Sequence, residues 1–381
     1  MRAMEKDQVS EKKITGKRLL SLDALRGFDM FFITGGAAAI SGICAAFGCQ
    51  DGWLAAQMKH VEWTGLAQHD TIFPLFLFLA GVSWPFSLGS QLDRGRSVWR
   101  IQAKIAVRTA ILFLLGFSFG GVLKFKPDFR LMGVLQYIGL SWGFAATAWL
   151  HIRRKGVLAA LVAALLVGYY ALLHFCVAPG APEGAWSYSV EGNIVSWMDK
   201  AVYGSHMVAG WGYEPESFFA IPTGIALALM GMFAGALLRR DDTQCTRRKC
   251  GILAVFAAAS GIAACVSVLV LGDPIVKKLW TVSFVLSAAS YSLFMLALFV
   301  LVVDVLGLRR WTVAFDPVGK NSILAYMLMM TGVMSVLQRW LFSGLCGYVG
   351  AWNGALAGLT SYLVTWSILW YLGRKGVFLK V

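Results

Sequence analysis

Charged side chains are scarce in this chain. Asp, Glu, Lys and Arg make up only 14% of its 381 residues, whereas hydrophobic residues make up 58% and the mean hydropathy is +0.67. A soluble protein of this length would need far more charge to solvate its surface. The composition therefore excludes an ordinary soluble domain.

Recognisable metal-binding patterns are also missing. The seven cysteines form no C-x-x-C pair and have no histidines at zinc spacing, so we expect no metal site. Cys44, Cys49, Cys176 and Cys346 lie near the outer ends of predicted helices, where one disulfide is an alternative to the favoured packed free thiols. No small-residue cleavage site follows the basic first 18 residues, which indicates an uncleaved first helix.

Long apolar stretches fill most of the chain instead. A helix needs about 20 apolar residues to cross a bilayer, and these stretches are continuous rather than alternating. We therefore predict an all-α, polytopic integral membrane protein with about ten spans: 28–48, 70–90, 105–123, 131–150, 157–177, 218–238, 251–271, 279–304, 321–342 and 352–372.

The distribution of basic residues predicts the orientation. An even number of spans puts both termini on one side, and most of the 34 Lys and Arg residues cluster at the termini and in loops on that side. The positive-inside rule then places both termini in the cytoplasm and His60 on the outer face. The net charge of +14 is thus a topology signal and not a sign of nucleic-acid binding.

No stretch is long enough for a separate soluble domain. We divide the chain into a basic cytoplasmic segment, 1–20, and a single transmembrane domain, 21–381. An outward loop, about 178–217, is rich in Gly, Pro, Trp and Tyr. It fits both an anchor in the headgroup zone and a lid over an outer cavity.

The strongest candidate for chemistry is His60 together with Asp70. W-T-G between them allows the chain to turn, so that the loop and the helix start face each other. A carboxylate that orients an imidazole makes it a base or a nucleophile. The alternatives are a surface histidine and an Asp70 that only caps its helix. His69 could compete, although it points about 100° further round the helix.

Other polar residues sit at the ends of predicted spans. Asp23 and Arg26 share one helical face at the cytoplasmic rim, where they form a local ion pair or brace a ligand phosphate. Seven further polar residues either contact a bound molecule or only bond one helix to another. They are Arg130, Gln136, Lys277, Lys278, Asn321, Ser322 and Tyr326.

Taken together, the motifs resemble one family. SLDALRG, KHVEWTGLAQHDTIFPLFLFLAG, RLMGVLQYIG, YEPESFFAIPTGIALALMGMFAG, KKLWTVSFVLSAAS and DPVGKNSILAY occur in the order found in the heparan-α-glucosaminide N-acetyltransferase family, a lysosomal enzyme and its bacterial relatives. The luminal segment and extra helix that precede this core in the lysosomal enzyme have no counterpart here. The SLDxLRG motif of another acyltransferase group is followed by a histidine where this chain has Gly36, which favours the first family.

The resemblance implies a reaction and a set of residues. Acetyl would pass from cytosolic acetyl-CoA to the amino group of an amino sugar or glycan on the outer face, in a homodimer of a bacterial inner membrane with His60 facing the periplasm. His60 and Asp70 match the family's catalytic positions, and Arg26, Arg130, Gln136, Lys278, Asn321 and Ser322 are the candidates for donor-binding contacts. The family's active-site Asn is replaced by the stretch Thr34-Gly35-Gly36-Ala37.

Two other functions remain as alternatives. An Asp and a His at the membrane suit a proton-coupled transporter of a small solute or sugar, although the chain has no inverted repeat and no paired broken helices. A structural or assembly protein would use the same motifs for helix packing alone.

Overall fold

The computed structural model describes residues 19–125, 127–208, 210–239 and 246–379. The predicted cytoplasmic segment 1–20 lies almost wholly outside these residues. Every regular element in the described part is a helix, apart from one isolated bridge between Val177 and Asn193. The prediction of an all-α protein is confirmed.

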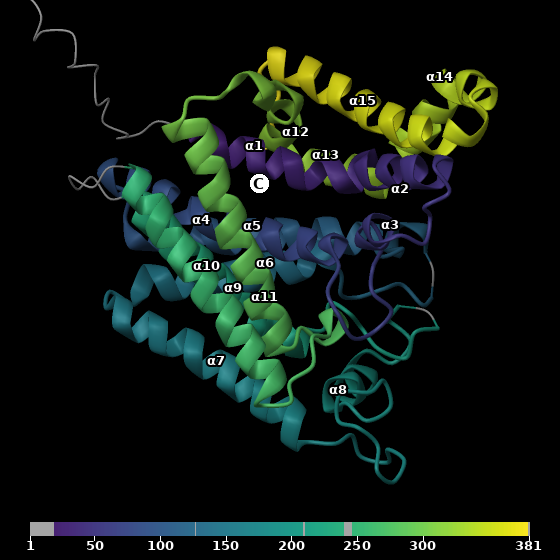
Figure 1. Ribbon diagram of the computed structural model, residues 1–381. Helices are drawn as coiled ribbons and strands as arrows, with labels where there is room; N and C mark the ends of the chain where they lie inside the picture. Colours follow the sequence, from purple (N-terminus) through teal and green to yellow (C-terminus); the bar gives the residue numbers. More distant parts are fainter. Residues whose placement is uncertain (1–18, 126, 209, 240–245, 380–381) are drawn as a thin grey trace, which may run out of the picture.

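Fifteen α-helices, joined by short π and 3₁₀ turns, make up the described part of the chain (Figure 1). They are α1 (Leu20–Phe31), α2 (Ala37–Ala46), α3 (Trp53–Gln57), α4 (Gln68–Asp93), α5 (Val98–Phe119), α6 (Val134–His151), α7 (Lys155–Phe175), α8 (Ile194–Tyr203), α9 (Ile221–Arg239), α10 (Thr246–Leu269), α11 (Val282–Phe299), α12 (Asp316–Lys320), α13 (Ser322–Met330), α14 (Val333–Tyr348) and α15 (Asn353–Arg374).

Eight helical segments of the described chain are long and apolar enough to cross a membrane, or nine if a bent pair counts as one span. The protein is thus an integral membrane protein, but the count of ten is not confirmed. Helix α6, the predicted fourth span, is only 18 residues long and carries Gln136 and Ser141 among its apolar residues. The predicted ninth span is the bent pair, because α13 and α14 meet at 75°. The side on which each terminus lies stays a prediction.

Helix α4 packs closely against α9 near its middle. A Cβ at Gly81 would overlap the carbonyl oxygen of Ala228. In the same way, a Cβ at Gly231 would overlap the carbonyl oxygen of Phe78, and one at Gly235 that of Val82. Small residues that let two backbones touch are typical of helix pairs in membranes. These contacts hold the middle of α4, and Asp70 lies at least two turns closer to its N-terminus.

The first span is broken. A π-helical segment, Phe32–Gly36, separates α1 from α2, and Gly35 has φ +150°. A side chain there would overlap the carbonyl oxygen of Gly358 in α15, so the break lies where α15 packs closely against this span. Figure 1 shows α15 lying along α1 and α2 at one edge of the molecule, with α7 at the opposite edge.

The described part of the outer loop 178–217, so named for its predicted side, is folded and carries α8. Trp63 Nε1, from the loop of His60, donates to the carbonyl oxygen of Tyr188 at 2.9 Å, and Leu131 N donates to that of His206 at 2.9 Å. The loop thus packs on the segment that bears His60. The four cysteines considered for a disulfide are free thiols; Cys44 and Cys346 are buried as predicted, whereas Cys49 and Cys176 are exposed.

Candidate functional site

His60 and Asp70 are in contact. His60 lies in the turn between α3 and α4, and its Nδ1 is 2.8 Å from Oδ1 of Asp70, in the first turn of α4. The other carboxylate oxygen accepts hydrogen bonds from the backbone N–H groups of Ala67 (3.1 Å) and Val61 (3.3 Å). Asp70 is 1% exposed, so the loop folds around a buried carboxylate that is satisfied on both oxygens.

Lys277 completes this group from a distant part of the chain. It lies in the short turn Lys277–Leu279 before α11, and its Nζ is 2.9 Å from His60 Nδ1 and 3.2 Å from Asp70 Oδ1. Burial lowers the pKa of Lys277, and the negative charge of Asp70 opposes that shift. The ring of His69 lies 4.6 Å from that of His60, centroid to centroid.

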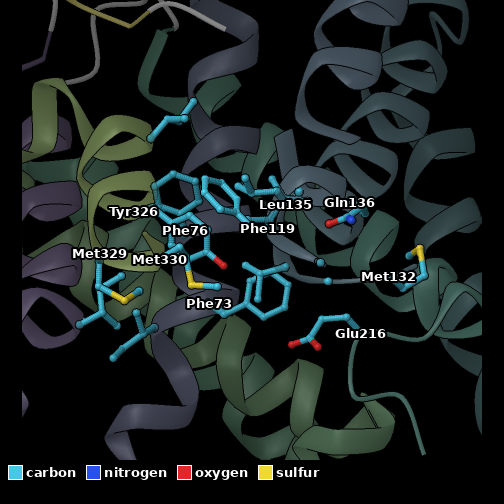
Figure 2. Close-up of a pocket in the computed structure, with 18 of the residues that line it drawn as sticks. Phe73, Phe76, Phe119, Met132, Leu135, Gln136, Glu216, Tyr326, Met329 and Met330 are labelled. Atoms are coloured by element: carbon cyan, nitrogen blue, oxygen red, sulfur yellow. The ribbon is translucent and has the colours of Figure 1, made fainter. Parts of the chain in front are cut away.

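A cavity of about 320 Å³ opens beside this group. His60, His69 and Lys277 line it together with Arg130, Gln136 and Glu216. Its remaining wall is mostly apolar and includes Met30, Ile33, Ile72, Phe73, Phe76, Phe119, Tyr326, Met329 and Met330. Figure 2 shows Tyr326, Met329 and Met330 on one side of this space and Gln136, Met132 and Glu216 on the other.

Arg130 and two carboxylates form the polar side of the cavity. Arg130 donates to both carboxylate oxygens of Glu214 and to Glu216. Burial raises the pKa of Glu214, and the bonds and charge of Arg130 oppose that shift. The cluster therefore contains two carboxylates and one guanidinium, where the outer loop meets the start of α6.

Gln136 also faces the cavity. Its Nε2 donates to the carbonyl oxygen of Leu131 at 3.1 Å, while its buried Oε1 has no partner among the described residues. A buried amide oxygen without a donor costs free energy unless a ligand or water supplies one. The Oε1 of Gln136 is thus a buried acceptor without a donor, on a residue that lines the cavity.

The other predicted contacts lie away from this cavity. Arg26 bonds Asp23, three residues earlier, at 3.4 Å and also bonds Ser83 of α4. Lys278 donates to the carbonyl oxygen of Glu62 and lies between aromatic rings of the outer loops. Asn321 bonds the backbone of Val377 and Leu379, both at 3.0 Å, and Ser322 begins α13; neither lines the cavity.

The stretch that replaces the family's Asn packs within the protein. Thr34 Oγ1 donates to the carbonyl oxygen of Met30 at 2.7 Å, one turn earlier in the same helix. The carbonyl oxygen of Thr34 accepts a bond from Ser361 of α15 at 3.0 Å. Thr34 therefore presents its polar atoms to helices and does not line the cavity.

Sequence reasoning missed two residues of the site. It noted the adjacent lysines Lys277 and Lys278 but selected Lys278, and only the turn before α11 aims Lys277 at His60. Glu216 belongs to the YEPES motif, which was noted for its resemblance and not for its charge. The two acidic residues of this motif were the feature of the sequence that could have indicated a partner for Arg130.

This arrangement can move a proton or a group at one imidazole nitrogen. His60 Nδ1 lies 2.8 Å from Asp70 and 2.9 Å from Lys277, and Nε2 has no hydrogen-bond partner among the described residues. Within the same part of the chain, no group of three or more His, Cys, Asp or Glu residues is placed to hold a metal ion. The chemistry available here is thus that of an oriented imidazole beside a largely apolar cavity.

Comparison with known proteins confirms the resemblance. The chain is 25% identical over 380 residues to the mouse protein heparan-alpha-glucosaminide N-acetyltransferase, and 27% identical over 368 residues to the human one. The matches cover 84% and 81% of this chain but 54% and 52% of the relatives, so the chain spans about half the length of the curated relatives it matches. No family model matches the chain.

Proposed function

We propose that this distant relative of heparan-alpha-glucosaminide N-acetyltransferases is a membrane-embedded acetyltransferase, which moves acetyl from cytosolic acetyl-CoA to the amino group of an amino sugar or glycan on the outer face. The observation that carries the proposal is the position of His60: Asp70 holds its Nδ1, and its ring lines a cavity between helices. The same geometry in a hydrolase triad makes Nε2 the reactive nitrogen.

His60 acts in one of two ways in this proposal. As a base, Nε2 takes the proton of the amine that attacks the thioester carbonyl, and passes it to the departing CoA sulfur. As a nucleophile, Nε2 accepts acetyl from the thioester and the amine then attacks the acetyl group. In both routes a C–N bond forms, the C–S bond breaks, and the proton lost by the amine ends on CoA.

The cavity suits the narrow arm of the donor. Its aromatic and methionine side chains favour a flexible, mostly apolar chain, and Gln136 Oε1 offers an acceptor to an amide N–H of that arm. Near the middle of α4, Arg26 bonds Ser83, and the guanidinium of Arg108 lies over the ring of Trp142 at 4.2 Å. Positive charge that is partly removed from water suits the phosphates of CoA.

The proposal further includes a bacterial inner membrane, His60 facing the periplasm, and a homodimer. Reaction across a membrane requires the donor and the acceptor to enter from opposite ends of the protein. His60 contacts Asp70 at the start of α4, and Arg26 bonds Ser83 about 20 Å further along that helix, which separates the two ends of the proposed path.

The test is transfer of labelled acetyl from acetyl-CoA to a panel of amino sugars by the purified full chain. His60→Ala should abolish transfer and retain stabilisation by CoA, whereas His151→Ala should leave turnover unchanged, because His151 bonds Gln102 away from the cavity. Undiminished turnover by the His60 variant would refute the assignment. Uptake of unmodified solute into proteoliposomes without acetylation would support a transporter instead.

A further inference from the structure

Three polar atoms form a closed triangle at His60. Lys277 Nζ lies 2.9 Å from His60 Nδ1 and 3.2 Å from Asp70 Oδ1, and these last two atoms are 2.8 Å apart. Lys277 is 217 residues from His60 in sequence, and its side chain is 20% exposed. The proposed reaction assigns roles to His60 and Asp70 but none to Lys277.

An imidazole nitrogen offers either a proton or a lone pair, and not both. If Lys277 donates to Nδ1, the neutral ring carries its proton on Nε2, which then cannot serve as a base. If Nδ1–H donates to Asp70, Lys277 donates to the same Asp70 oxygen and Nε2 keeps a bare lone pair. Because Asp70 is buried and carries negative charge, the second arrangement gives its Oδ1 two donors, and it leaves Lys277 Nζ and His60 Nδ1 as two donors 2.9 Å apart.

The ammonium group of Lys277 also affects how many protons the ring holds. A ring protonated on both nitrogens is a cation about 3 Å from another cation, and like charges at this separation disfavour each other strongly where water is partly excluded. The other titratable groups facing this pair are His69, Asp70, Glu216 and Lys278. Of these, Asp70 is the one that contacts both partners.

We propose that Lys277 is a positioning residue: its ammonium, held by Asp70, opposes a second proton on the His60 ring. The catalytic meaning of this inference rests on the proposed acetyl transfer. During the reaction the amine proton moves to Nε2 and then to the CoA sulfur, while Nδ1 and Lys277 keep theirs. Repulsion from Lys277 favours the second step because it destabilises the doubly protonated ring.

The first test is the pH profile of kcat/KM for Lys277→Met, Lys277→Arg and the wild type. The acid limb of the Lys277→Met profile should move to higher pH by about one unit, because one positive charge beside the ring is gone. Lys277→Arg, which keeps that charge, should restore the wild-type limb. Lys200→Met in α8 is the control for removing a charge from the outer side. An unchanged acid limb in Lys277→Met would overturn the inference.

A second test needs no turnover. The His60 ring of ¹⁵N-histidine-labelled protein, identified by its loss in His60→Ala, is titrated by NMR in both backgrounds. Lys277→Met should take up the second ring proton at higher pH than the wild type by about one unit, and identical titrations would overturn the inference. If Lys277→Met does not fold, Lys277→Gln removes the charge and keeps a donor. A wild type inactive in transfer refutes the proposed function, and the titration still decides the role of Lys277.

Discussion

His60 Nδ1 lies 2.8 Å from Asp70 Oδ1, and the same carboxylate binds the backbone on both sides of the intervening loop. One buried side chain therefore orients the imidazole and shapes the turn that presents it. Loss of this carboxylate affects chemistry and local folding together, and the choice of substitution separates the two.

Asp70→Asn should lower kcat/KM by about 100-fold or more, because an amide no longer fixes the Nδ1 proton as a carboxylate does. The measurement is transfer of labelled acetyl, with stabilisation by CoA as a check on folding. Asp93→Asn at the other end of α4 is a matched control, since Asp93 is 74% exposed and its ion pair with Arg239 is long, at 3.9 Å. Wild-type turnover in Asp70→Asn would contradict the role of Asp70.

Arg130→Met should destabilise the protein by about 3 kcal/mol, because it leaves the carboxylates of Glu214 and Glu216 buried without their cation. Thermal unfolding measures this loss. Burial places the pKa of Glu214 above its usual 4.5, so the folded protein retains a proton that the unfolded chain releases. Stability of the variant should accordingly fall as the pH rises from 4.5 and recover on acidification.

A triple variant provides the control for that prediction. Arg130→Met combined with Glu214→Gln and Glu216→Gln removes both negative charges, and it should be more stable at neutral pH than Arg130→Met alone. Equal stability of the two variants at neutral pH would show that unpaired charge is not the cause.

Gly231→Ala should destabilise the protein by about 1–3 kcal/mol, because the added Cβ overlaps the carbonyl oxygen of Phe78 and forces α4 and α9 apart. Gly251→Ala in α10 is the matched control, because a Cβ there meets no other atom within 4 Å. Thermal unfolding in the same detergent compares them. Equal midpoints would mean that α4 and α9 do not need this close approach.

The outer loop should loosen as the pH rises. Asp199 in α8 is fully buried and accepts a bond from Ser217 at 2.8 Å; burial and the nearby Glu214 raise its pKa from 3.8 to about 7. Between these values the folded loop holds a proton that the unfolded chain has lost, so its stability falls with rising pH and levels off above about pH 7.

Hydrogen exchange of residues 178–217 measures this dependence. Asp199→Asn keeps the bond from Ser217 without the charge, and it should give exchange protection that does not change between pH 4 and 7. Protection in the wild type that rises with pH over this window would contradict the assignment to Asp199.

The amino-acid sequence by itself determined that the protein is helical and that its helices lie in a membrane. Continuous apolar stretches require internally bonded backbone in lipid, which is why most predicted spans match observed helices. The short spacing between His60 and Asp70, with W-T-G between them, also allowed the contact that the structure shows, because the chain can turn there. Hydropathy says little about bends, however, so the 75° angle between α13 and α14 was not foreseen.

Tertiary structure decided which polar residues share the cavity. Lys277 reaches His60 across 217 residues and Arg130 reaches Glu214 across 84, and no local pattern encodes such distances. Asn321 looked equally suited to ligand binding but bonds the backbone near the C-terminus. Whether a polar side chain reaches the cavity depends on the direction in which its helix or turn points it. The packing of the helices against one another sets that direction.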